Sequence, residues 1–338
     1  MTPLKHSRNS FFDLRSKDKV LVDRMPYIVE SEARGGMGSV LLLRKEIENN
    51  EHLLSALGLK LALKAVLPES ADEDAIALFR RELTVWSAFQ HPNIIRLLAI
   101  VDGGDAGWIA AMDWCPGSLR DLLDERGKFA LKDATNILGN LIDGLTHAYE
   151  QDQVLHLDLK PENVLYHLNF GRLLSGCEDP EDSLIKYRFM VSDWGIASIK
   201  QSKLNAIAGM PPTAADAQKT FNNMGTLLYM APERFKEGYS SSIPSDIFSL
   251  GMIFLEMLVG HRPFRPGYHP VHLLVTGQYL QDSALLLRRE KVPKPIAELI
   301  YSMIAFSPSE RPQNYTILRK RLVKGWRKSN GMLSKLFN

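Results

Sequence analysis

The sequence predicts an α+β protein with two lobes, a small β-rich lobe followed by a larger lobe that is mainly helical. Two observations support this fold class. Strand-like apolar runs fill the first third of the 338 residues, and helical periodicity dominates after Leu119. A chain of this length fits about two domains, or one domain with two lobes. With 45% hydrophobic and 24% charged residues, the composition is that of a globular protein and excludes disordered, collagen-like and coiled-coil chains.

The first third of the chain contains the expected strands and one helix. Residues 1–24 are polar and are expected to form a flexible arm. Residues 72–89 are expected to be helical, because apolar residues recur there at three- and four-residue steps. Runs of β-branched and aliphatic residues predict strands at residues 27–29, 40–43, 61–63, 94–101 and 108–114.

The remainder of the chain is expected to consist of helices joined by loops. Residues 168–186 and 199–223 contain many Gly, Asp, Pro, Ser and Asn residues, a composition typical of loops. The periodicity of apolar residues predicts helices at 119–125, 133–151, 245–259, 294–305 and 314–327.

These patterns suggest the boundaries of the folded part. We expect one domain over residues 25–323, with the smaller lobe at about 25–114 and the larger at about 115–323. Residues 324–338 form a basic C-terminal tail. An amphipathic, solvated final helix explains this tail better than a segment that docks on a membrane or a partner.

Charge and cysteine content narrow the function classes. The formal net charge of +2 gives no reason to expect nucleic-acid binding. Two cysteines in a chain of this length do not make a disulfide framework, which favours a reducing compartment. Residues 1–20 lack the apolar core of a signal peptide, and residues 250–259 are too few for the roughly 20 of a membrane span. We therefore expect a cytoplasmic protein without a transmembrane segment.

A glycine cluster at residues 33–38 (Ala-Arg-Gly-Gly-Met-Gly) lies between two of the expected strands. Glycine backbones can close on a phosphate and present N–H groups to it, although a plain hairpin turn fits the cluster equally well. No helix follows it and no Gly-Lys-Ser/Thr ends it, which excludes Rossmann and Walker A loops. Lys64, central in an apolar strand, needs a partner if it is buried. Glu82 can supply one, unless both residues simply lie at the surface.

Three later segments contain the residues that decide the function. They are residues 156–163 (His-Leu-Asp-Leu-Lys-Pro-Glu-Asn), 193–195 (Asp-Trp-Gly) and 231–233 (Ala-Pro-Glu). Together with the glycine cluster, Lys64 and Glu82, they resemble the ordered motifs of the protein kinase superfamily. The resemblance covers residues 27–323 and implies the bilobal protein kinase fold. Two later landmarks also match: Asp246, and the arginine that pairs with the Ala-Pro-Glu glutamate, here Arg311 with Glu233.

The resemblance implies a Hanks-type serine/threonine kinase that transfers the γ-phosphoryl group of ATP. Asp158 would act as catalytic base and Lys160 would neutralise the moving phosphoryl group, with Thr226 bracing both. Asn163 and Asp193 would hold Mg²⁺, or Mn²⁺ in its place. Lys160, two residues after the base, is typical of serine/threonine rather than tyrosine kinases. The implied ATP-binding residues are Ala33, Gly35, Gly36, Gly38, Val40, Ala62, Lys64, Glu82, Met112, Asp113, Cys115 and Leu165.

Three departures from the family pattern leave alternatives open. Leu157 replaces the Arg that receives an activation-loop phosphate, so we predict that activity does not require phosphorylation of that loop. Ala33 replaces the first loop glycine, and Trp194 replaces the usual Phe. These changes keep a pseudokinase, acting as a nucleotide-binding or interaction module, as the alternative. A kinase-like enzyme acting on small molecules is the third candidate, but such enzymes generally lack the Ala-Pro-Glu, Asp246 and Arg311 features.

The expected partner is a protein substrate that carries Ser or Thr. Thr213 and Thr220, in the long segment before residues 231–233, are candidate autophosphorylation sites by position alone. No sensor domain is visible in the sequence, so the input signal would come from a regulatory partner, an operon neighbour or the inserted loops. The Gly-Gly-Met-Gly loop resembles those of bacterial kinases, which favours a bacterial source.

Overall fold

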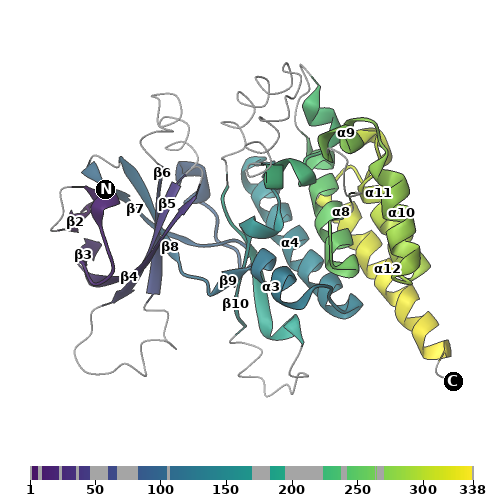
Figure 1. Cartoon of the computed structure of the whole chain (residues 1–338), viewed down its shortest axis with the longest axis horizontal. Helices are drawn as coiled ribbons and strands as arrows, with labels where there is room; N and C mark the ends of the chain where they lie inside the picture. The colour runs from purple at the N-terminus through teal and green to yellow at the C-terminus, as the bar shows by residue number, and fades with distance from the viewer. Residues whose placement is uncertain are drawn as a thin grey trace. The chain divides into compact units, whose positions relative to one another are not determined.

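The computed structural model divides into two compact units (Figure 1). The smaller unit comprises Met1–His91 and Ile95–Cys115, and the larger comprises Pro92–Ile94 and Pro116–Asn338. Strands dominate the first unit and helices the second, which confirms the α+β fold class. The structure describes residues 2–6, 10–22, 25–35, 38–45, 60–66, 83–104, 107–169, 183–194, 224–236, 242–262, 264 and 270–336.

An eight-stranded sheet forms the smaller unit, in the order β1-β7-β8-β6-β5-β4-β3-β2. All neighbours are antiparallel except β1 and β7. One face is apolar because alternate residues of a strand point to the same side, as Leu41 and Leu43 do. The strands are β1 (Thr2–Pro3), β2 (Lys5–His6), β3 (Lys19–Val22), β4 (Met25–Gly35), β5 (Gly38–Lys45), β6 (Lys60–Val66), β7 (Leu97–Asp102) and β8 (Trp108–Asp113).

The expectation of a flexible arm over residues 1–24 is wrong wherever that stretch is described. Strands β1 to β3 belong to the sheet, and the 3-10 helix η1 (Phe11–Asp13) begins with a Ser10 cap whose side chain accepts a hydrogen bond from Phe12 N–H at 3.2 Å. Phe11 and Leu14 are completely buried in the core of the sheet. Large apolar side chains spaced among charged residues anchor this segment, so its polar average composition is misleading.

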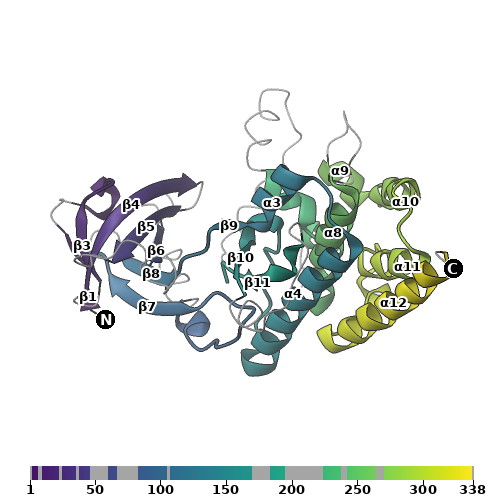
Figure 2. The same cartoon turned by 90° about the horizontal axis from the view of Figure 1, so that it is seen from below.

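The larger unit is built around two helices, α4 (Leu131–Asp152) and α8 (Ile243–Val259). Every residue of α8 is buried, as expected for a helix that is apolar on all sides. A glycine allows one close approach, because a Cβ atom on Gly251 would lie 2.6 Å from Cγ2 of Ile304. Helices α11 (Lys294–Met303) and α12 (Tyr315–Leu336) pack against this pair (Figures 1 and 2).

The five expected helices of this unit are present, and two more, α9 and α10, were not expected. A small sheet with the order β11-β10-β9 carries the loops that matter for function. The remaining elements are α3 (Leu119–Arg126), α9 (Pro270–Val275), α10 (Tyr279–Arg289), β9 (Gly117–Ser118), β10 (Val164–Leu168), β11 (Tyr187–Val191), and the 3-10 helices η4 (Pro161–Asn163), η5 (Leu184–Lys186), η6 (Met224–Tyr229), η7 (Pro232–Phe235) and η8 (Pro308–Glu310).

The basic tail expected at residues 324–338 is not a separate segment, since α12 continues to Leu336. Leu318, Leu322, Gly325 and Ser329 are buried at three- and four-residue steps, while the lysines and arginines between them are largely exposed. This part of α12 is therefore amphipathic. Within the described part of the chain, none of the helices has both the length and the hydropathy of a membrane span.

Candidate active site

The loop that follows α4 brings three of the predicted catalytic residues together. Asp158 is buried, and its Oδ2 atom accepts hydrogen bonds from Lys160 Nζ at 3.2 Å and from Asn163 Nδ2 at 3.1 Å. Asn163 Nδ2 also donates to the main-chain oxygen of Asp158 at 2.9 Å. The closely spaced sequence and the 3-10 turn η4 make this possible, because they fold the chain back on itself within six residues. The Asp158 carboxylate is consequently held in one orientation.

Asp246, a buried carboxylate of α8, holds the backbone of the two residues that precede Asp158 in the sequence. Asp246 accepts hydrogen bonds from the backbone N–H groups of His156 and Leu157, each at 2.8 Å, and from the Tyr315 hydroxyl at 2.8 Å. Leu157 has a φ of 61°, a left-handed conformation that bulky residues rarely adopt. Arg234 donates to its carbonyl oxygen. Contacts on both sides of Leu157 therefore hold the strained turn that positions the next residue.

His156 connects this loop to the segment that carries Asp193. Its Nδ1 accepts a hydrogen bond from Asp158 N–H at 3.3 Å, and its Nε2 lies 2.8 Å from the carbonyl oxygen of Ser192. A carbonyl can only accept, so Nε2 must be the nitrogen that carries the proton. The Trp194 ring lies 5.1 Å from the imidazole, centroid to centroid. One side chain thus ties the catalytic loop to the residues on both sides of Asp193.

The register of two strands explains why the predicted metal ligands are neighbours. Val164 of β10 pairs with Val191 of β11. Asn163 therefore precedes, and Asp193 closely follows, the same rung of this ladder. The Asn163 amide nitrogen is bound to Asp158, which leaves its amide oxygen as the acceptor for a cation. Two oxygen donors suit Mg²⁺, which keeps several of its water ligands in proteins. Among the residues that the structure describes, no three His, Cys, Asp or Glu side chains cluster as a metal cage.

In the smaller unit, four predicted ATP-binding residues lie on one face of the sheet. Val40 of β5 pairs with Lys64 of β6, and Ala62 pairs with Met112 of β8. Residues directly opposite each other, or two apart on one strand, share a face. The opposite face holds the apolar core. In the backbone of the glycine hairpin, Ala33 pairs with Val40 and Gly35 with Gly38.

Cys115, one of the implied ATP-binding residues, lies at the end of the smaller unit and has a weakly reactive thiol. Burial, aided by the negative charge of Asp113, raises the pKa of its thiol to about 12. Since only the thiolate is a good nucleophile, this side chain is a poor one. Asp113 itself binds Arg96 through both carboxylate oxygens, at 3.0 and 3.1 Å. Leu165, the remaining predicted ATP contact, lies in β10 opposite Ser118 and Met190.

Several predicted residues lie outside the described part of the chain. Gly36 and Glu82 are among them, so the Lys64–Glu82 pair stays a prediction. The expected helix at 72–89 is described only from Leu83 onward, and Leu83 to Trp86 are helical. Thr213 and Thr220 are outside as well, as is the side chain of Thr226.

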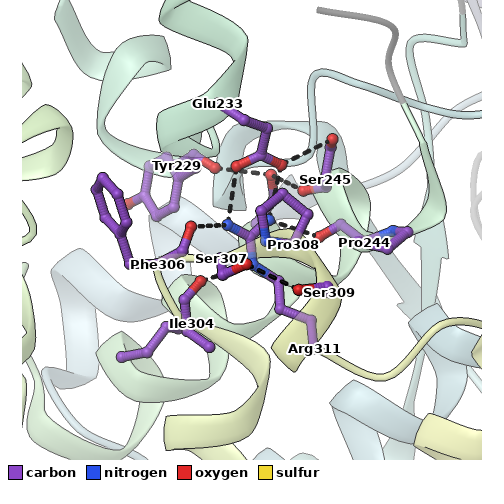
Figure 3. Close-up of polar contacts among 12 residues, drawn as sticks. Tyr229, Glu233, Pro244, Ser245, Ile304, Phe306, Ser307, Pro308, Ser309 and Arg311 are labelled. Carbon is purple, nitrogen blue, oxygen red and sulfur yellow. Dashed lines mark hydrogen bonds and ion pairs between the residues drawn. The ribbon is translucent and has the colours of Figure 1, made fainter.

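The ion pair expected between Glu233 and Arg311 is confirmed (Figure 3). Two guanidinium nitrogens of Arg311 lie 2.7 and 2.8 Å from the two carboxylate oxygens of Glu233. Arg311 also donates to the carbonyl oxygens of Pro244, at 3.0 Å, and Phe306, at 3.1 Å, and Ser245 Oγ donates to Glu233 at 3.0 Å. Both charged side chains are almost fully buried. The pair joins η7, which contains Pro232 and Glu233 of the Ala-Pro-Glu motif, to the loop before α12.

A second polar cluster did not emerge from the sequence: Arg120 binds the buried Glu256, the Tyr229 hydroxyl and Glu162, whose side chain is 37% exposed. One signal could have revealed it. Glu256 interrupts the most apolar stretch of the chain, and a carboxylate buried in such a helix needs a cationic partner. The sequence does not say which cation that is, because Arg120 lies 136 residues away.

The comparisons with known proteins agree with this geometry. A model of the protein kinase domain matches residues 34–323. The serine/threonine-protein kinase PrkC of Bacillus subtilis is 26% identical over 278 residues, covering 82% of this chain and 37% of PrkC. The calcium/calmodulin-dependent protein kinase type 1B of Rattus norvegicus is 28% identical over 239 residues, covering 70% and 58%. The chain thus spans less than two thirds of the length of either relative.

Among solved structures, the kinase domain of Mycobacterium tuberculosis PknI superposes with a TM-score of 0.56 at 17% identity. The superposition covers 88% of this chain and 96% of that domain. At this level of identity, the similarity establishes the shared fold.

Proposed function

The chain belongs to the protein kinase domain family, and from this premise we propose that it is an active serine/threonine kinase that uses ATP. The observation that carries the proposal is the Asp158 carboxylate, which Lys160 and Asn163 hold in place from the same loop. A buried, oriented carboxylate suits a base that accepts the proton of a Ser or Thr hydroxyl. The proposal extends to protein substrates, including Thr213 and Thr220 of the chain itself.

Each polar residue of the loop has a distinct part in this proposal. Lys160 places a positive charge beside Asp158, where the phosphoryl group would pass. Asn163 and Asp193 would hold Mg²⁺, or Mn²⁺ in its place, which neutralises charge on the phosphates when bound. Lys64 and the glycine hairpin would bind the phosphates, and the face shared by Val40, Ala62 and Met112 would contact adenine.

We expect purified protein with radiolabelled ATP and Mg²⁺ to transfer phosphate to itself or to a generic protein, and Lys64→Met to reduce transfer by about 100-fold or more. The physical reason is the loss of a cation that would bind the ATP phosphates. Lys60→Met, in the same strand but paired with Glu30 at 2.7 Å, is the matched control. If ATP raises the melting temperature of the wild type and no phosphate is transferred, the pseudokinase alternative replaces this proposal.

We further expect treatment with a protein phosphatase to leave most of the activity intact. Leu157 carries no charge with which to bind an activation-loop phosphate, so removing such a phosphate removes no contact there. Initial rates before and after treatment should agree within about twofold, with dephosphorylation verified by mass spectrometry. A drop of more than tenfold would show that another residue reads the phosphate.

A further inference from the structure

Glu162 and the buried Glu256 form an acidic pocket beside the loop of Asp158, which Arg120 fills, while Arg262 lies 3.9 Å from Glu162. Arg120 Nε donates to Glu162 at 3.1 Å, and its two terminal nitrogens bind the carboxylate of Glu256 at 2.9 and 3.3 Å. One of these nitrogens also donates to the Tyr229 hydroxyl at 2.6 Å, and the other lies 3.5 Å from Asp124. A guanidinium has five N–H donors, and each of them has an oxygen within reach here.

This arrangement is anchored by elements on every side. Arg120 is the second residue of α3, whose start is fixed by a capping box between Ser118 and Asp121. Glu256 lies in the buried helix α8 with only 3% of its side chain exposed, against 15% for Arg120. Burial disfavours the charge of Arg120, but hydrogen bonding to Glu256 and the surrounding negative groups outweigh it and raise the pKa of Arg120. The guanidinium therefore stays charged in the pocket.

If Asp158 is the base of the proposed function, a substrate chain bound there would pass close to Glu162. Glu162 is in η4, four residues after Asp158 and directly before Asn163. A peptide whose hydroxyl reaches Asp158 brings its neighbouring side chains close to this carboxylate. An uncompensated carboxylate there would attract arginine or lysine from the peptide. Glu162 is compensated, however, because its Oε1 atom binds Arg120 at 3.1 Å and lies 3.9 Å from Arg262. The side chain is 37% exposed, although its Oε2 atom is buried without a hydrogen-bond partner among the described residues.

We propose that Arg120 is a specificity-determining residue, which fills the Glu162–Glu256 pocket as an internal cation and so excludes arginine side chains of the substrate. The inference rests on the proposed kinase function and defines its substrate class as Ser or Thr in sequences without a required basic residue. An incoming guanidinium would have to displace one that already has a fork geometry on Glu256 and is held by its own chain.

The pocket also predicts what happens when the arginine is removed. Formal charges of Arg120, Arg262, Glu162, Glu256 and Asp124 leave the cluster with one net negative charge. Without Arg120, two remain, together with a vacant space of guanidinium shape. The wild-type protein is expected to show no preference between basic and uncharged peptides, and Arg120→Ala should consequently prefer basic peptides.

The first experiment compares two synthetic peptides with one serine each, identical except for three arginines or three glutamines before it. We expect the ratio of kcat/KM for the arginine peptide over the glutamine peptide to be near one for wild type, and about tenfold higher for Arg120→Ala. Arg126→Ala, which removes the exposed arginine of the same helix, should keep the wild-type ratio. Arg120→Ala combined with Glu256→Gln should return most of the way to it. Equal ratios in wild type and Arg120→Ala would overturn the proposal.

The second experiment needs no kinase activity. Ethylguanidinium chloride at millimolar concentration should raise the melting temperature of Arg120→Ala by about 2–4 °C through binding to the folded state. It should not raise that of wild type or Arg126→Ala, and ethylammonium chloride should have a smaller effect. If neither peptide is phosphorylated, this experiment alone decides on the pocket, where equal shifts in all proteins would overturn the proposal. The proposed function fails only if the protein also transfers no phosphate to itself or to a generic protein. If Arg120→Ala does not fold, Arg120→Lys replaces it, with a smaller expected rise in both measurements.

Discussion

Replacing Asp158 by asparagine is expected to lower the rate of phosphate transfer by about 10²–10⁴-fold, the usual contribution of a positioned base. The change removes the acceptor for the substrate proton and keeps the shape of the side chain. The amide oxygen of Asn at this position can still accept the hydrogen bonds from Lys160 and Asn163 that hold Asp158 now, at 3.2 and 3.1 Å. The measurement is the initial rate of transfer from labelled ATP at saturating Mg²⁺.

A matched control separates the loss of the base from a general loss of charge. Asp152→Asn removes an exposed carboxylate at the end of α4 and should leave the rate within about twofold of wild type. The melting temperature of Asp158→Asn should stay close to that of wild type, because the hydrogen bonds are preserved. Transfer above one tenth of the wild-type rate would show that Asp158 is not the base.

Replacing Arg311 by methionine is expected to lower the free energy of unfolding by about 3–5 kcal/mol. The arginine side chain is completely buried and forms an ion pair through both oxygens of Glu233, whose side chain is only 4% exposed. Its loss leaves a carboxylate buried without its cation and frees the carbonyl oxygens of Pro244 and Phe306 that now accept from it. Urea unfolding followed by tryptophan fluorescence measures the effect.

Two further variants show whether burial is the cause. Arg319 binds Asp143 with similar geometry, at 2.8 and 3.2 Å, but the two side chains are 41% and 39% exposed. Arg319→Met should therefore cost only about 0–1 kcal/mol. Adding Glu233→Gln to Arg311→Met should recover part of the lost stability, because no buried charge is then left unpaired. Equal costs for Arg311→Met and Arg319→Met would contradict the assigned role.

Local patterns in the sequence predicted much of the fold and the catalytic loop. The apolar residues of α4 and α8 made both helices predictable. Helix α4 buries one face and α8 buries all of its faces, and each arrangement leaves a recognisable apolar pattern in the sequence. Asp158, Lys160 and Asn163 lie within six residues, and a short turn is enough to bring their side chains together. Where a buried face includes polar residues, the pattern is weaker. Helix α10 buries Tyr279, Ser283 and Leu287. It was missed because the polar Ser283 interrupts the apolar spacing. Burial of Ser283 is possible because its hydroxyl donates a hydrogen bond to Tyr279 O of the same helix.

In the N-terminal segment, the average composition led to a wrong prediction. Average polarity predicted a flexible arm over residues 1–24, whereas Phe11 and Leu14 are fully buried in the core of the smaller unit. Whether an isolated apolar side chain is buried depends on the surface that another part of the chain offers it. That surface here comes from strands that follow later in the sequence.

By itself, the sequence determined the fold class, the order of the motifs, and the short loop in which Asp158, Lys160 and Asn163 lie together, because these depend on periodicity and on residues close along the chain. Only the tertiary structure decided which cation meets Glu256. A carboxylate in an apolar helix, such as Glu256, needs a cationic partner, but the sequence offers many arginines and lysines that could supply it. Folding brought Arg120 to Glu256 across 136 residues and to Glu162 across 42 residues, and α3 packs against η4 in the larger unit. Buried charges are tolerated only when they are paired. The tertiary packing, which no local sequence pattern encodes, made Arg120 the partner of Glu256.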